Sequence, residues 1–93
     1  MISISSNLNI MIKAAEKASK LVIRDFGEVE KLQASNKGPR DFVNKTGKRV
    51  ESIIIEELSK TKKNYSFLSK KIGSIINKDK ENIWIIDPID GTI

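Results

Sequence analysis

The stretch Ile83-Trp84-Ile85-Ile86-Asp87-Pro88-Ile89-Asp90-Gly91-Thr92 decides how the rest of the chain is interpreted. Its first four residues form an uninterrupted apolar run, which predicts a strand buried on both faces, with Trp84 packed in the core. Proline fixes its own φ and pushes Asp87 into an extended conformation, so the strand is expected to end in a turn. The carboxylates of Asp87 and Asp90 and the carbonyl of Ile89 can then converge on one point.

Two interpretations of this turn remain open from the residue types. Asp, Pro and Gly each favour turns, so the segment is explained without any ligand. The two carboxylates, the carbonyl and the Thr92 hydroxyl also form an all-oxygen set that suits a hard cation such as Mg²⁺. Gly91 permits close approach of the backbone, and sheets commonly place ligands at the carboxyl ends of their strands.

Two amphipathic helices are predicted before this strand. Apolar residues recur at spacings of three and four from Asn7 to Phe26, and Gly27 stands where a helix commonly ends. A second pattern of this kind runs from Thr46 to Lys62, with Thr46 as its N-cap. Both helices are expected to serve as scaffold.

The segments between these elements are expected to be strands and turns. The Gly38-Pro39 pair predicts a hairpin-type loop between short strands at residues 31–35 and 41–43. Tyr65–Leu68 is short and aromatic and predicts another strand. Residues 72–81 are polar and predict a solvated turn.

Composition limits the chemistry that the chain can perform. With 93 residues it makes at most one small domain, and without cysteine or histidine it lacks disulfides, thiolate ligands and the usual general base. No apolar run is long enough to span a membrane, and we expect a cytoplasmic protein. Lys and Arg outnumber Asp and Glu by 17 to 12, but the lysines are dispersed and no aromatic cluster accompanies them, so nucleic-acid binding is not predicted.

At these residues the chain resembles the inositol monophosphatase family, whose signature contains D-P-[LI]-D-G-[ST]. Residues 35–43, S-N-K-G-P-R-D-F-V, are similar to the family's K-G-x-x-D-x-V segment. The resemblance implies an α/β (α+β) fold, the N-terminal part of a layered αβαβα sugar-phosphatase fold with two helices and a few strands. Residues 1–93 would form an incomplete N-terminal portion of that domain. It also places Lys37 in a mobile loop near the site and Asp41 in a hairpin, where a surface or turn role explains them equally well.

The resemblance further implies a Mg²⁺-dependent phosphatase that hydrolyses inositol phosphates with metal-activated water. Asp87 would bridge two metal ions, the Ile89 carbonyl would bind the first and Asp90 the second. Thr92 would be the catalytic residue that orients the attacking water. Asp90, Gly91 and Thr92 would contact the substrate.

Two departures from the family pattern change this expectation. The family carries a Glu-Glu pair, whose first carboxylate binds metal, where this chain has Lys70-Lys71. The family's V-T-x-x-D segment ends here in Gly47 instead of aspartate. We expect the Lys70 ammonium to take part of the first metal's place and to pair with Asp87 or Asp90. The alternative is that Lys70 and Lys71 point into solvent.

The chain matches only the first third or so of a family member, so we expect it to be inactive alone. An exposed apolar strand edge predicts a homo-oligomer or association with a complementing C-terminal half. The alternative function is a non-catalytic binding or scaffold fragment that uses this edge or the basic surface.

Overall fold

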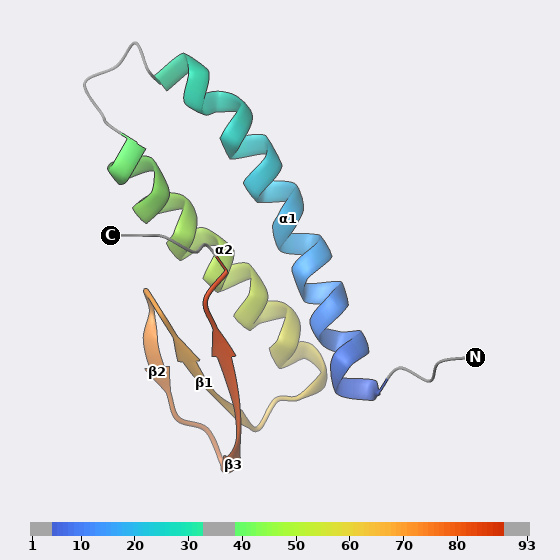
Figure 1. Cartoon of the computed structure of the whole chain (residues 1–93). Coiled ribbons are helices and arrows are strands. Elements are labelled where there is room, and N and C mark those ends of the chain that lie inside the picture. The colour runs from blue at the N-terminus through green and yellow to red at the C-terminus, as the bar shows by residue number, and fades with distance from the viewer. Residues whose placement is uncertain (1–4, 33–38, 89–93) are drawn as a thin grey trace.

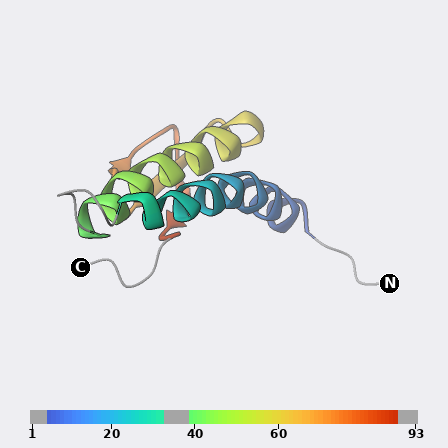
Figure 2. The ribbon, with the colours of Figure 1, turned by 90° about the horizontal axis from the view of Figure 1, so that it is seen from above.

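The computed structural model describes the backbone of residues 5–32 and 39–88 and the side chains of residues 5–25 and 44–88. The elements in chain order are α1 (Ser6–Leu32), α2 (Pro39–Thr61), β1 (Tyr65–Ser69), β2 (Gly73–Ile75) and β3 (Asp79–Ile86). The two helices lie side by side and run in opposite directions, with the small sheet next to α2 (Figure 1). Figure 2 shows the same helix pair from above. Within the described ranges, no helix is long and apolar enough to cross a membrane.

Both predicted helices are present, but each is longer than its apolar pattern indicates. Helix α1 continues past Gly27 to Leu32, so the expected end at this glycine is wrong. A glycine inside a helix costs only about 1 kcal/mol relative to alanine, and the Glu-Val-Glu-Lys-Leu that follows does not break a helix.

Helix α2 begins at Pro39, seven residues before the predicted start at Thr46. Proline is favoured in the first helical turn, because its fixed φ suits a helix and no hydrogen bond is lost there. The strand predicted at residues 41–43 is therefore wrong, and Asp41 belongs to α2. Of the strand predicted at residues 31–35, residues 31 and 32 are helical and the others lie outside the described residues.

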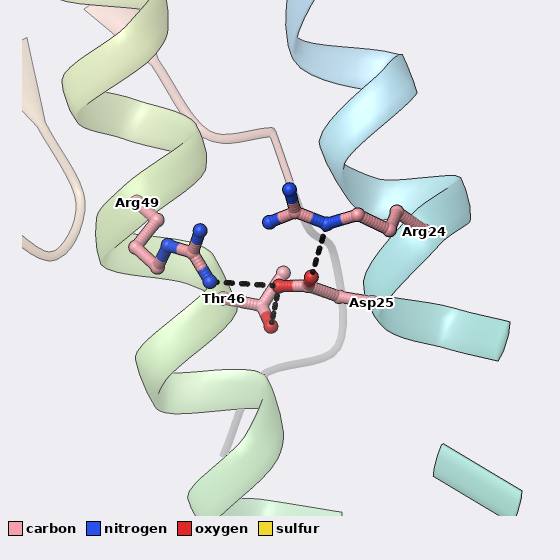
Figure 3. A network of polar contacts seen from close by, with 4 residues as sticks. All are labelled: Arg24, Asp25, Thr46 and Arg49. Atoms are coloured by element: carbon pink, nitrogen blue, oxygen red, sulfur yellow. Dashed lines mark hydrogen bonds and ion pairs between the residues drawn. The ribbon is translucent and has the colours of Figure 1, made fainter. Parts of the chain in front are cut away.

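A polar network around the buried Asp25 carboxylate joins the two helices and gives Thr46 its role (Figure 3). The Asp25 carboxylate of α1 is buried and accepts a hydrogen bond of 3.0 Å from the Thr46 hydroxyl. Arg49 of α2 and Arg24 of α1 each approach the same carboxylate at 3.4 Å. Thr46 therefore bonds across to α1 instead of capping α2.

Among the side chains that the structure describes, the apolar core has two clusters. One cluster lies between α1 and α2, and the other lies where both helices meet the sheet. The first cluster comprises Ala18, Leu21 and Val50, with Val22, Ile53 and Ile54 packed against it. The second comprises Ala14, Leu58, Phe67 and Ile86, with Ile10, Ile54, Ile55, Ile75 and Trp84 packed against it.

The sheet has the order β2-β1-β3, with β1 antiparallel to β2 and parallel to β3. The strand predicted at Tyr65–Leu68 is confirmed as β1. The solvated turn predicted at residues 72–81 is wrong in part, because β2 and the start of β3 lie there. Gly73 begins β2 with a φ of 99°, a conformation that glycine adopts without strain and that allows the tight turn after β1.

The predicted strand at residues 83–86 is confirmed as the end of β3, but it is not buried on both faces. Ile86 is buried and Trp84 packs against the core, as expected, with its ring 5.7 Å from that of Tyr65. Ile83 and Ile85 are 53% and 77% exposed. Alternate residues of a strand point to opposite faces, and within the described part of the chain the helices cover only one of them.

Candidate functional site

The carboxyl ends of the parallel strands β1 and β3 bring Lys70 and Asp87 together. The register pairs Ser69 with Ile86, the last residues of the two strands. Lys70 and Asp87, which follow them, therefore lie side by side. The backbone N–H of Lys70 donates a 3.1 Å hydrogen bond to the Ile86 carbonyl. Lys70 Nζ lies 3.7 Å from Asp87 Oδ1, and the two side chains are 40% and 48% exposed. The ion pair expected from the sequence is present.

Lys71 contacts helix α2 and not Asp87. Its Nζ donates a 3.1 Å hydrogen bond to Asn44 Oδ1, one turn before Gly47 in α2. Its aliphatic stem lies over Gly47 so closely that a Cβ on that residue would be 2.4 Å from Lys71 Cε and 2.6 Å from Cδ. The alternative in which both lysines point into solvent therefore does not describe this structure.

Glu51 of α2 contacts the segment that carries the two lysines, and it was not identified from the sequence. It is 1% exposed and accepts hydrogen bonds from the Ser69 hydroxyl and from the Lys71 backbone N–H, the latter at 2.7 Å. Its spacing from Gly47 and Leu58 places it on the core face of α2, and an acid at such a position is the signal that could have identified it.

Several predicted site residues lie outside the described residues. These residues are Lys37, Ile89, Asp90, Gly91 and Thr92. Asp41 lies in α2, but its side chain is not described. Of the predicted site, the structure thus brings together Asp87 and Lys70, while the convergence of Asp87 with Ile89, Asp90 and Thr92 remains a prediction.

The described residues around Asp87 do not fit a divalent cation. A Mg²⁺ site needs several oxygen ligands, whereas the charged group that faces Asp87 is an ammonium. Among the side chains of residues 5–25 and 44–88, no three of the types His, Cys, Asp or Glu gather closely enough to hold a metal ion. The sign of the charge contributed by Lys70 opposes a second cation at this turn.

Comparison with known proteins connects this geometry to one family. The model of the inositol monophosphatase family matches residues 4–93. An inositol-1-monophosphatase of Mesorhizobium japonicum is 47% identical over 88 residues, which cover 95% of this chain and 33% of the relative. The Nus factor SuhB of Vibrio cholerae is 40% identical over 85 residues, which cover 91% of this chain and 32% of the relative.

A solved structure shows the same arrangement of helices and strands. The extragenic suppressor protein suhB from Bartonella henselae superposes with a TM-score of 0.75 at 35% identity, over 95% of this chain and 32% of that chain. The expected fold class, α+β with two helices and a few strands, is confirmed. The chain belongs to the inositol monophosphatase family. It spans about a third of the length of the curated relatives that it matches.

Proposed function

We propose that residues 1–93 correspond to the N-terminal third of an inositol-phosphate phosphatase domain and hydrolyse no phosphomonoester by themselves. The family match supports the assignment of the chain to this domain, since it runs from residue 4 through the acidic turn that follows β3. The match covers 33% of the inositol-1-monophosphatase of Mesorhizobium japonicum, so about two thirds of that relative lie outside it.

The observation that carries the proposal is the 3.7 Å contact between Lys70 Nζ and Asp87 Oδ1. In the domain that the family resemblance implies, Asp87, Asp90 and the Ile89 carbonyl form a metal-binding turn. In this chain Asp87 faces the Lys70 ammonium, and the residues described do not fit Mg²⁺. We therefore propose no hydrolytic step that depends on that metal here.

We also propose that the later residues of the turn contact the substrate in the complete domain. Asp90, Gly91 and Thr92 would contact the phosphate and ring hydroxyls of an inositol phosphate, with the Thr92 hydroxyl available to orient a water molecule. In this chain these groups lack the carboxylates that the family pattern has where Lys70 and Lys71 stand.

Release of inorganic phosphate from inositol 1-phosphate in the presence of Mg²⁺ tests the proposal. The natural chain is compared with Lys70→Glu/Lys71→Glu, with a chimera that adds the remaining two thirds of the Mesorhizobium relative, and with both changes combined. Lys78→Glu/Lys80→Glu in the chimera is a control with the same change of charge. We expect phosphate release only from the chimera that also carries Lys70→Glu/Lys71→Glu. Release by the natural chain would refute the proposal.

A second candidate function, non-catalytic binding, is favoured by the exposed side of β3. Ile83 and Ile85 are largely exposed, and among the described strands β3 pairs with β1 alone. An open strand edge with apolar residues beside it readily pairs with another strand. The partner that we propose is the C-terminal two thirds of an inositol monophosphatase domain, because about two thirds of the curated relatives lie outside the match.

Light scattering coupled to size-exclusion chromatography tests this binding. The chain is mixed with the separately produced C-terminal two thirds of the Mesorhizobium relative. A 1:1 complex that Ile85→Lys abolishes would support the candidate, and Ile23→Lys on the exposed side of α1 is the matched control. A homo-oligomer that Ile85→Lys disrupts, or no association at all, would contradict it.

A further inference from the structure

Helix α2 and strand β3 hold the backbone of residues 69–71 from two sides. On the α2 side, the Glu51 carboxylate accepts hydrogen bonds from the Ser69 hydroxyl and the Lys71 N–H. On the β3 side, the Lys70 N–H bonds to the Ile86 carbonyl. Lys70 is therefore the middle residue of a segment whose neighbours are both attached to α2.

The side chain of Lys71 attaches the segment to α2 at a further point. Its stem lies in the space that a side chain at position 47 would fill, and its ammonium bonds to Asn44 one turn earlier. Only glycine leaves this space open, since a Cβ at position 47 would overlap two carbons of the stem. Gly47 and Lys71 are thus complementary in shape.

We propose that this attachment makes Lys70 a built-in cation of the Asp87 turn, which replaces a divalent metal ion, and that Gly47 is the residue that permits it. The inference deepens the proposed function, because it explains at one site why the turn needs no added cation. In this proposal Gly47, Lys70 and Lys71 act together to position the ammonium. They are three positions at which the chain departs from the family pattern.

The attachment matters because an exposed ion pair is otherwise weak. Two long side chains in water lose rotational freedom when they pair, and this loss cancels most of the attraction. Lys70 and Asp87 leave adjacent strand ends whose backbones are already joined, so less freedom remains to be lost. The strand register therefore places the Lys70 ammonium 3.7 Å from the Asp87 carboxylate without an added cation.

Titration of the ¹⁵N-labelled full chain with MgCl₂, followed through the Asp87 amide resonance, tests the cation itself. Lys70→Met keeps an apolar stem of similar length and removes the charge. We expect Mg²⁺ to bind the Lys70→Met variant at Asp87 about thirtyfold more tightly than the natural chain, since one unit charge about 4 Å from a doubly charged ion interacts with it by about 2 kcal/mol in water. Lys78→Met, which removes a charge elsewhere, should leave the affinity unchanged. Equal affinities of the natural chain and Lys70→Met would overturn the proposal.

Gly47→Ala tests the role of the glycine. The variant should fold, because alanine is the better helix former and its Cβ overlaps only carbons of a flexible side chain. We expect the Asn44 side-chain amide resonances to shift as Lys71 leaves, and the Mg²⁺ affinity at Asp87 to rise about threefold, between the natural chain and Lys70→Met. Asn44→Ala, which frees the ammonium without crowding, should act in the same direction. Unchanged affinity in both variants would refute the role of Gly47.

These titrations are independent of the phosphatase assay. Tight Mg²⁺ binding by a natural chain that releases no phosphate would overturn the built-in cation and leave the proposed function standing. The opposite combination is also distinguishable. If the natural chain releases phosphate while Lys70→Met still binds Mg²⁺ more tightly than the natural chain, the proposed function is refuted and the built-in cation stands.

Discussion

Replacing Glu51 with alanine is expected to destabilise the protein by about 2 kcal/mol. The substitution leaves two buried donors without an acceptor, the Ser69 hydroxyl and the Lys71 N–H. Each unsatisfied buried donor costs about 1–3 kcal/mol. Removing a carboxylate that is itself 1% exposed relieves its own desolvation, and this offsets part of the loss. A loss of about 2 kcal/mol lowers the melting temperature of a domain of this size by roughly 8–16 °C.

Urea denaturation followed by circular dichroism measures this loss. Glu56→Ala is the matched control, because Glu56 is an exposed acid on the same helix, and its change should stay within about 0.5 kcal/mol. Glu51→Gln keeps an acceptor oxygen and should lose less than Glu51→Ala. If Glu51→Ala and Glu56→Ala unfold at the same urea concentration, the reasoning about buried donors is wrong.

Three further predictions concern the core, the helix pair and the response to acid. Leu58→Ala, in the cluster where the helices meet the sheet, should cost about 2–5 kcal/mol in urea denaturation, and a loss below 1 kcal/mol would contradict the packing described. Asp25→Ala leaves a buried threonine hydroxyl unpaired and should lower stability by about 1–3 kcal/mol, whereas an exposed acid of α1 changed in the same way should not. Hydrogen bonds from Lys60 and Lys17 lower the pKa of Glu57, so its stabilising contribution is complete above the ordinary carboxyl pKa and is lost as the pH falls through the lowered pKa. An NMR titration of Glu57 checks this, and Lys60→Met should raise its pKa toward the ordinary value.

Local patterns in the sequence predicted the presence of most elements but not their ends. The apolar spacing indicated both helices, and the run at residues 83–86 indicated the end of β3. The Gly38-Pro39 pair was interpreted as part of a loop between strands, although proline also favours the first turn of a helix. The same residue types are compatible with both structures, so the boundary of α2 could not be predicted from them.

The burial of particular side chains depended on contacts that the local sequence does not contain. The run at residues 83–86 is apolar throughout, yet Ile85 is exposed because the described helices cover only one face of the sheet. Glu51 belongs to a helix rich in charged residues. Its carboxylate is buried against Ser69 and Lys71, which follow it by 18 and 20 residues and donate hydrogen bonds to it. An acid on a helix is ordinarily solvated, so the spacing that puts Glu51 on the core face does not by itself reveal the two donors that it binds.

The sequence by itself determined that the chain carries an Asp-Pro turn after an apolar strand, and that lysines stand where the family pattern has carboxylates. Both are properties of neighbouring residues, which is why no coordinates were needed. Only the tertiary structure decided that Lys70 meets Asp87 while Lys71 turns away to Gly47 and Asn44. The physical reason is distance along the chain: the parallel register of β1 and β3 and the packing of α2 join residues 17 to 27 positions apart.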